Sequence, residues 1–261
     1  MSASRAPVAF VGHGSPMNAI EDNAWSRGFK DLGRALPKPK AVLAVSAHWY
    51  IRGTALTGND LPPTIHDFGG FPEALYEVHY AAPGSRDVAK RAAELIGPGT
   101  AISFDWGLDH GTWSVLCHMI PDAGCPVIQL SIDAEAPAAR HVEIGRALAP
   151  LRDEGVMILG SGNIVHNLRD AFMRMRSGDF ETPSWSSDFD AAVTDALDHR
   201  NVDTLARLIE SKDAPRAHPT PDHYLPLLYA AGAAGDDAAA YPITGFDLGS
   251  LSMRSVVFGA A

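Results

Sequence analysis

The sequence predicts a single α/β domain, with a central sheet of mainly parallel or mixed strands and helices on both of its faces. Short apolar runs rich in Val and Ile recur along the chain. Each run is about four to eight residues long and ends at turn-forming residues, as is typical of strands buried on both faces. Segments with helical spacing of apolar residues lie between them. No internal repeat or low-complexity tract interrupts this alternation, so we expect residues 1–261 to form one domain.

The alternation can be followed element by element. The final apolar run resembles a last strand, and the helical segments separate most of the earlier strands, as expected when parallel strands are joined by crossover helices. The expected strands are residues 8–11, 41–47, 101–104, 127–132, 156–159 and 252–258. The expected helices are residues 25–36, 86–96 and 138–151, with one or two more within 188–209.

Composition excludes several classes of protein. A net charge of −10, without any cluster of Lys and Arg, argues against nucleic acid or an anionic membrane surface as the main partner. No apolar stretch approaches the roughly 20 residues that span a bilayer, and the N-terminal apolar run is too short for a signal peptide. We therefore expect a cytoplasmic protein. Cys117 and Cys125, the only cysteines, are expected to be buried small hydrophobic residues in a reducing compartment.

Histidines follow three of the predicted strands. The chain contains eleven histidines, many of them beside Gly, Pro or Asp. His13 comes directly after the first strand, His48 directly after the second, and His166 shortly after the strand at 156–159. Ligands of open α/β sheets bind beyond the carboxyl ends of the strands. If these three strands are parallel, the three histidines meet at one edge of the sheet.

His13 and His48 are the foremost candidates for metal ligands. Imidazole is a common ligand of zinc and iron, and it needs a rigid scaffold. Gly12 and Gly14 flank His13, where they allow a tight bend and the approach of a metal without obstruction by a Cβ atom. The alternative for His13 is a turn histidine that caps the following helix, and for His48 a histidine satisfied at the edge of the sheet.

A Pro-rich turn contains two more histidines, His218 and His223. Thr220 and Pro221 are expected to begin a helix, as its N-cap and first residue, which would put His223 in the first turn. Both histidines could bind one metal, or one could bind while the other forms a hydrogen bond. The alternative is that one or both pack beside the start of the helix.

Two loops have the composition of binding loops on a rigid frame. Residues 105–113 are rich in polar groups, aromatic residues and Gly, and are expected to enter a helix at Thr112. Within them His110 could donate a hydrogen bond to an oxygen of a ligand; the alternative is an ordinary capping loop. Residues 65–72 resemble a lid or pocket wall with Asp67 as its polar anchor.

Several common signatures do not occur in the sequence. There is no HExxH motif of zinc peptidases, and no paired CxxC of a zinc ribbon. A GxSxG nucleophile motif, a P-loop and a dinucleotide-binding fingerprint do not occur either. The candidate chemistry therefore rests on histidines in turns.

Six motifs, in order, resemble those of the class III extradiol ring-cleavage dioxygenases, and within them the 4,5-DOPA-extradiol-dioxygenase-like subfamily. The resemblance runs from about residue 8 to residue 258. Its specificity comes from the ordered set, since each motif alone is weak. The motifs are GHGSPMNAI, SAHWY, IHDFGGFP, LDHGTWSVL, GSGNIVHNLR and HPTPDHYLPLLYAAGAA.

The resemblance implies a mononuclear Fe(II) enzyme that uses O2 to open the ring of a small catechol. Its motifs make His13 and His48 metal ligands. The wider family has a Glu as third ligand, whereas the matching segment here offers His223, and an all-histidine site is consistent with zinc as well as iron. The resemblance also makes His166 the acid/base residue, with the alternative that it lies close enough to bind the metal as well, and it makes His110 a contact to substrate or oxygen.

His218 and Asp67 are additional candidates for the same site. Two other functions remain open on this scaffold: a zinc-dependent hydrolase, because zinc activates water, and a metal-binding protein without catalysis.

Overall fold

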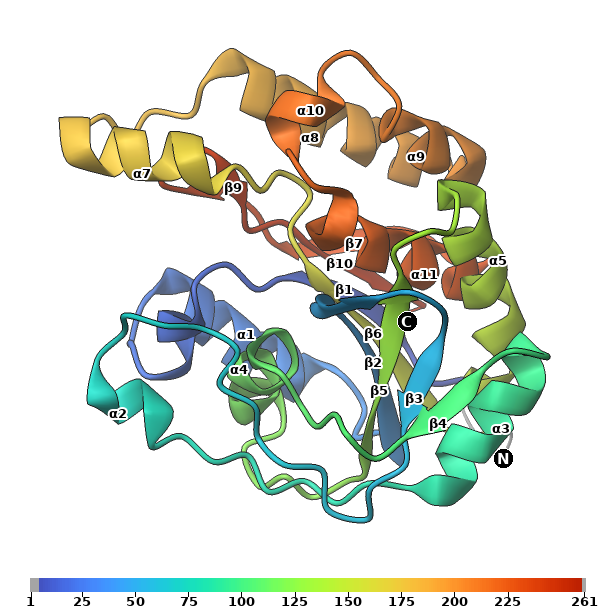
Figure 1. The fold of residues 1–261 in the computed structure, drawn as a ribbon. Coiled ribbons are helices and arrows are strands. Elements are labelled where there is room, and N and C mark those ends of the chain that lie inside the picture. The colour runs from blue at the N-terminus through green and yellow to red at the C-terminus, as the bar shows by residue number, and fades with distance from the viewer. Residues whose placement is uncertain (1–4, 260–261) are drawn as a thin grey trace.

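The computed structural model describes residues 5–259. One mixed eight-stranded sheet runs through the molecule in the order β4-β3-β5-β2-β6-β1-β10-β7 (Figure 1). Its four middle strands, β5, β2, β6 and β1, are parallel to one another, and this group pairs antiparallel with β3 on one side and with β10 on the other. The predicted α/β class with a mixed sheet is confirmed. The strands are β1 (Val8–Gly12), β2 (Ala41–Ile51), β3 (Ala55–Thr57), β4 (Ala101–Ser103), β5 (Val127–Asp133), β6 (Val156–Gly162), β7 (Ala239–Ile243) and β10 (Ser255–Phe258).

Helices cover both faces of the sheet, and each face has its own apolar core. Val8 and Phe10 pack into one core while Ala9 and Val11 pack into the other, as expected for a strand buried on both sides. One face is covered by η1 (Pro16–Ala19), α1 (Ala24–Ala35), α2 (Glu73–Tyr76) and α4 (His110–Met119). The other is covered mainly by α3 (Arg86–Ile96), α5 (Ala138–Leu148), α6 (Pro150–Asp153), α8 (Ser184–Asp198), α9 (Val202–Leu208), α10 (Ala214–Ala217) and α11 (Leu225–Ala234).

Three predicted strands differ from the observed ones. β2 continues to Ile51, so His48 lies within the strand rather than after it. Residues 101–104 give only a short edge strand that is partly exposed, not a strand buried on both faces. Residues 252–258 are split, because β8 (Phe246–Asp247) and β9 (Leu251–Ser252) form a separate two-stranded ribbon before β10 begins.

The observed helices differ from the predicted ones at two prolines, Pro150 and Pro221. The predicted helix 138–151 divides into α5 and α6 at Pro150, which has no backbone N–H to continue the first helix. Residues 188–209 form α8 and α9. Thr220 makes no side-chain cap; Pro221 begins a short 3-10 turn, η2 (Pro221–His223), and α11 follows it.

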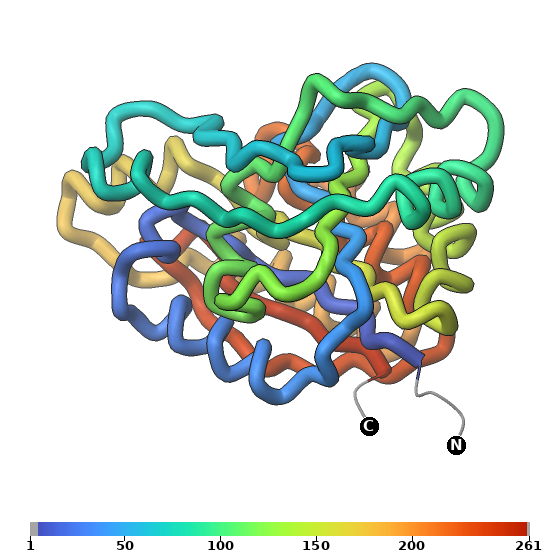
Figure 2. The backbone as a smooth tube through the Cα atoms, turned by 90° about the horizontal axis from the view of Figure 1, so that it is seen from below, coloured from blue at the N-terminus to red at the C-terminus, as the bar shows by residue number. Residues whose placement is uncertain are grey.

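A long connection between β3 and α3, residues 58–85, brings further side chains to the carboxyl edge of the sheet. Figure 2, which views the molecule from below, shows it as an extended turquoise trace across the molecule. It is tied to the start of α4, because the N–H of Ile65 donates to Leu108 and the indole of Trp113 donates to the carbonyl of Ile65. Among residues 5–259, no helix is both long and apolar enough to cross a bilayer.

Candidate metal centre

Three of the predicted histidines leave one edge of the sheet. β2, β6 and β1 are neighbouring parallel strands, so the expectation that their carboxyl ends lie together is confirmed. His13 follows β1 directly and His166 follows β6. His48 projects from the end of β2, where the pairing with β5 shifts register.

Two more histidines reach the same edge from other elements. His110 is the first residue of α4, two positions before the predicted helix start. His223 ends η2, and its carbonyl oxygen accepts a hydrogen bond from the N–H of Asn163 at 2.9 Å. A side chain at Gly162 would collide with the backbone of His223, so glycine here allows β6 to hold η2 in direct contact.

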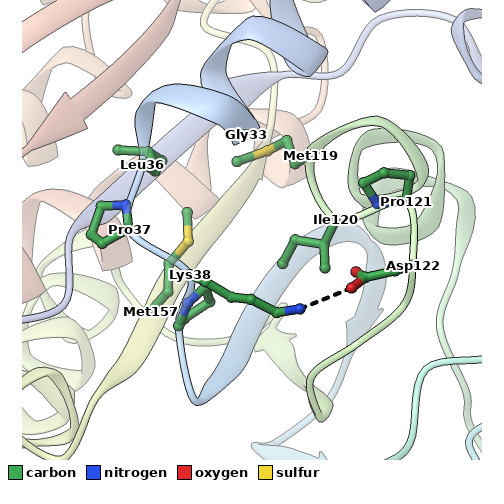
Figure 3. Close-up of a pocket in the computed structure, with 10 residues that line it drawn as sticks. Gly33, Leu36, Pro37, Lys38, Met119, Ile120, Pro121, Asp122 and Met157 are labelled. Carbon is green, nitrogen blue, oxygen red and sulfur yellow. Dashed lines mark hydrogen bonds and ion pairs between the residues drawn. The ribbon is translucent and has the colours of Figure 1, made fainter.

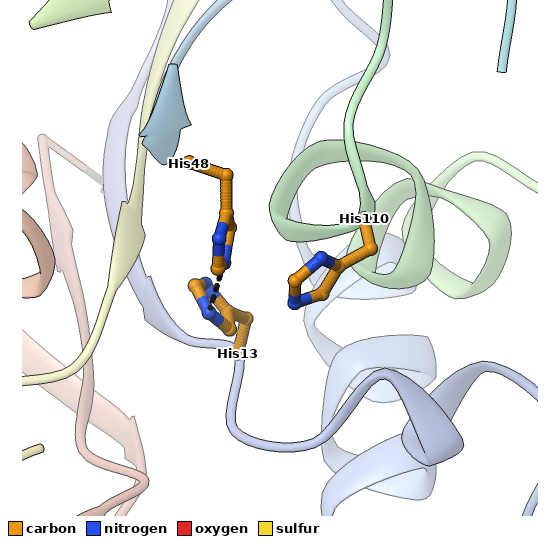
Figure 4. A group of neighbouring side chains, drawn as sticks. All are labelled: His13, His48 and His110. Carbon is orange, nitrogen blue, oxygen red and sulfur yellow. Dashed lines mark hydrogen bonds between the residues drawn. The ribbon is translucent and has the colours of Figure 1, made fainter. Parts of the chain in front are cut away.

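The five imidazole rings converge. The Nε2 atoms of His13 and His48 are 3.1 Å apart, and one ring nitrogen from each of His13, His48 and His110 lies within 4.8 Å of the others (Figure 4). The ring centroid of His223 is 5.2 Å from that of His13 and 5.0 Å from that of His48. His166 stacks on His223 with the centroids 3.5 Å apart. The residues that the motifs singled out therefore form one cluster.

A hydrogen-bond chain defines the tautomer of His13. The hydroxyl of Ser161 donates to the carbonyl of Gly111 at 2.5 Å, so its oxygen is left to accept from Nδ1 of His13, 2.9 Å away. With its proton on Nδ1, His13 presents an unprotonated Nε2 to His48. This nitrogen is the one that a metal would use.

Carboxylates stand behind the other rings. Asp67 accepts from Nδ1 of His110 at 2.8 Å, and Nδ1 of His48 lies 3.4 Å from the same oxygen. Asp222 accepts from Nδ1 of His223 at 2.5 Å. Metal-bound histidines almost always donate their second N–H to such an acceptor. When Nδ1 of a ring carries the proton in this way, its Nε2 atom is unprotonated and free to bind a metal.

This donor set fits a divalent metal ion. The Nε2 atoms of His13 and His48 face each other at 3.1 Å, where Nε2 of His48 can donate a hydrogen bond to that of His13, or both atoms can bind one cation. Neutral imidazoles with outer acceptors on Nδ1 are the usual ligands of zinc and non-haem iron. The chemistry of the cluster therefore supports a single metal site.

Burial keeps the cluster neutral in the absence of a metal. Loss of hydration, and secondly the neighbouring imidazoles, hold the pKa of His13 and of His223 well below the ordinary value. Burial is also the main cause that lowers the pKa of His48 to about 3 and that of His166 to about 4. All four rings are thus in the neutral form near pH 7, which is the form that binds a metal or accepts a proton.

The two additional candidates lie at different distances from the metal-binding nitrogens. Asp67 lies behind His110 and His48 as their acceptor; burial opposes its ionisation, but its bonds to His110 hold the pKa of Asp67 below the usual range. His218 is buried outside the cluster, where its ring stacks on Tyr224 at 5.0 Å and meets the edge of Phe189 at 5.1 Å. It therefore packs beside the start of α11.

The glycines that flank His13 fit one part of the prediction, the tight bend, but not the other, the approach of a metal. A Cβ atom on Gly12 would lie 2.7 Å from the backbone of Met253, and one on Gly14 would lie 2.7 Å from the sulfur of that residue. Gly14 also has a φ of +62°, which favours glycine. The expectation that these glycines make room for a metal is wrong, because Met253 fills the space beside them.

A cavity of about 440 Å³ opens onto the cluster. The five imidazoles line this cavity, and so do the aromatic rings of Phe68 and Phe71 from the long connection. Trp49 and Trp113 do not line it and are buried in the core. The size and apolar character suit a small aromatic ligand. The remaining lining residues are Gly14, Ser15, Pro16, Leu168, Phe172, Met175, Asp247, Leu248 and Leu251.

A second cavity, of about 380 Å³, lies at the opposite end of the strands (Figure 3). Met157 at the start of β6 and Met119 at the end of α4 line it, and an exposed ion pair between Lys38 and Asp122 stands at its mouth. It has no histidine among its lining residues in the described part of the chain. The cavity that opens onto the histidine cluster is therefore the candidate catalytic site.

Three polar residues of the site escaped the sequence prediction. Asp222 adjoins His223, and that adjacency was an available signal. Ser161 and Asp109 lie within two of the motifs, and Asp109 adjoins His110, but the side chains that pair with them meet them only in the fold. Asp109 is fully buried and accepts from the hydroxyl of Ser46 at 2.6 Å, and burial raises the pKa of Asp109 to about 6. Although Asp109 stands at the N-cap position of α4, its carboxylate makes no capping hydrogen bond to that helix.

We expect Asp67→Asn to weaken metal binding about 10- to 100-fold, because an amide is a poorer partner for Nδ1 of the proposed ligand His48, 3.4 Å from Asp67, and no longer favours the tautomer that leaves its Nε2 free. Competition with a chelator measures this change. Asp60→Asn, which alters an exposed carboxylate of the same connection, is the control. Equal affinities in the two variants would contradict the role assigned to Asp67.

An α/β sheet whose carboxyl edge combines clustered neutral imidazoles with an apolar cavity defines a metalloenzyme acting on a small aromatic molecule. Residues 7–259 match the family model described as the catalytic LigB subunit of aromatic ring-opening dioxygenase. The chain belongs to this family, and the predicted enzyme class is confirmed.

Relatives support the same assignment along nearly the whole chain. The sequence is 48% identical to 4,5-DOPA dioxygenase extradiol of Escherichia coli K12, over 99% of this chain and 97% of that protein. It is 39% identical to 4,5-DOPA dioxygenase extradiol of Beta vulgaris, over 95% of each. A crystal structure of an uncharacterized Escherichia coli K12 protein matches with a TM-score of 0.83 and 42% identity, and covers 97% of this chain and 100% of that one.

Proposed function

We propose that this chain, as one domain of residues 1–261, is an Fe(II)-dependent extradiol dioxygenase that cleaves the ring of a small catechol with a DOPA-like side chain. The observation that carries the proposal is the set of imidazoles whose Nδ1 atoms are each paired with an acceptor, so that their Nε2 atoms face one cavity. The names of the relatives support the substrate class.

His13, His48 and His223 are the proposed metal ligands. Rings that each presented one nitrogen at about 2.1 Å to the same ion, at octahedral or tetrahedral angles, would have centroids about 5 Å apart. The three separations within this set are 5.0, 5.2 and 5.0 Å, which fits that arrangement. His110 satisfies the simpler criterion of nitrogen proximity, but its centroid is only 3.9 Å from that of His48, closer than two rings that radiate from one ion.

His166 is the proposed acid/base residue. It lines the cavity, stacks on His223 and is neutral near pH 7, so it can accept a proton from a catechol hydroxyl and later return it. His110, whose Nδ1–H donates to Asp67, would present its unprotonated Nε2 from the opposite side and accept a hydrogen bond from a hydroxyl of the substrate. Phe68 and Phe71 would hold the planar ring between these groups.

Iron is the proposed metal because ring cleavage consumes O2. Bound Fe(II) would supply redox chemistry and bring the electron-rich ring and O2 together. Zinc, which the all-nitrogen donor set also accommodates, would instead favour hydrolysis. The proposal places the enzyme in the cytoplasm, where reduced iron and the free thiols of Cys117 and Cys125 are maintained.

Anaerobic reconstitution followed by addition of O2 tests this function. Protein loaded with Fe(II) should consume one O2 per catechol and form a yellow ring-fission product, and protein loaded with Zn(II) should do neither. An absence of O2 uptake by the iron form with every catechol of a panel would sink the proposal. Hydrolysis by the zinc form would then favour the alternative.

A further inference from the structure

One wall of the catalytic cavity carries a carboxylate that the proposed chemistry does not use. Asp247 lines the cavity together with the histidines. Among the lining residues within the described part of the chain, it is the one carboxylate, and there is no Lys or Arg. Behind the imidazoles, Asp67 and Asp222 add further negative charge. These three carboxylates outweigh the charge of one divalent ion on the imidazoles, so the wall at Asp247 is electrostatically better suited to a cation than to an anion.

Asp247 is held in place by its hairpin. It ends β8, and the following turn places Leu248 at a φ of +48°, a left-handed conformation that a branched residue rarely adopts without other support. The hairpin docks on the segment that contains His166. The N–H of Ser252 donates to Val165 at 2.9 Å, and Leu251 forms a bridge with His166. The hairpin that carries Asp247 is thus fixed relative to the catalytic segment.

Within the described part of the chain, Asp247 has no cationic partner. It forms no ion pair within residues 5–259, whereas nearby arginines are engaged elsewhere: Arg174 pairs with Asp170, and Arg254 pairs with Asp190. Burial raises the pKa of Asp247 above its ordinary value; a backbone hydrogen bond from Leu248 opposes this shift, and the charge of Glu21 adds to it. A half-buried carboxylate without a counter-ion is stabilised when a ligand supplies a positive charge.

We propose that Asp247 binds the ammonium group of the substrate and thereby selects catechols with a cationic side chain over those with a carboxylate. This inference rests on the proposed function, because it assigns the other end of the substrate to the histidine cluster. An amino-acid side chain would direct its ammonium to Asp247 and its carboxylate towards solvent. If Asp247 were only a solvated surface carboxylate, the protein would not discriminate between catechols with cationic and with anionic side chains.

Binding without O2 tests the proposal separately from turnover. The probes are three catechols that differ in the charge of one substituent: 4-(2-aminoethyl)catechol, 4-ethylcatechol and 3-(3,4-dihydroxyphenyl)propionate. Calorimetry on anaerobic, metal-loaded protein should show the amine bound about tenfold more tightly than 4-ethylcatechol, as expected for one hydrogen-bonded charge pair, and the acid bound least.

Variants identify the residue responsible. Asp247→Asn should bring the amine to within about twofold of 4-ethylcatechol, whereas Asp247→Glu should keep the preference. Asp236→Asn, an exposed carboxylate outside the cavity, is the control. Retention of the amine preference in Asp247→Asn, or its absence in the wild type, overturns the inference. If the iron form fails to cleave 4-ethylcatechol while the binding preference holds, the proposed function fails instead.

Discussion

Alanine at His13 or His48 should leave the protein folded but without its metal. Each substitution removes one of three proposed ligands, and the remaining two histidines should bind the ion too weakly to keep it during desalting. Elemental analysis after loading and desalting should find less than about a tenth of the wild-type metal content. His223→Ala should behave in the same way, whereas His110→Ala should retain the metal.

His199→Ala is the matched control, because this histidine is exposed and distant from the cavity lining. Full retention of metal in the His13 or His48 variant would refute the ligand assignment. Loss of metal from His110→Ala but not from His223→Ala would exchange the roles of those two residues.

His166→Ala should keep its metal and lose turnover. The side chain is the proposed proton acceptor, and removal of a general acid/base group typically lowers kcat about 10²- to 10⁴-fold. Metal content and the anaerobic affinity for catechol should stay near wild type, so the defect should appear in kcat. Added imidazole should restore part of the rate if the missing group is a proton carrier. Cleavage at the normal rate would show that another residue moves the proton.

Much of the fold could be predicted because the strands of the sheet are apolar on both sides. The runs at β1, β5 and β6 are buried throughout or nearly so, and no polar alternation obscures them. The edge strand β4 and the ribbon strands β8 and β9 were harder to predict from the sequence. β4 is partly exposed, and β8 and β9 contain only two residues each, too few for a periodic signal.

The candidate site was predictable where its residues follow strands. His13, His48 and His166 could be placed together because parallel strands end at one edge. The approach of His110 and His223 depends on tertiary packing, and the motif resemblance supplied what periodicity could not. The hydrogen-bond partner of His13, Ser161, is brought to the ring by the pairing of β1 with β6. Such contacts have no local sequence signature.

The charge of the cavity also arises only from the fold. Asp247 lies 81 positions after His166 in the sequence, counting from 166 to 247, yet its hairpin packs on the segment that contains this histidine. Charge that is distributed along the chain becomes a selective feature only when the structure gathers it around one cavity.

The origin of the product oxygen tests the central claim most directly. The iron form should be supplied with catechol under ¹⁸O₂, and the aldehyde of the product should be trapped by rapid reduction before it exchanges with water. Mass spectrometry should then find two ¹⁸O atoms per molecule, one in the new carboxylate and one in the trapped alcohol, since a dioxygenase transfers both atoms of O2 to the opened ring. A product whose new oxygen comes from water would contradict ring cleavage by O2 and indicate hydrolysis at this histidine site.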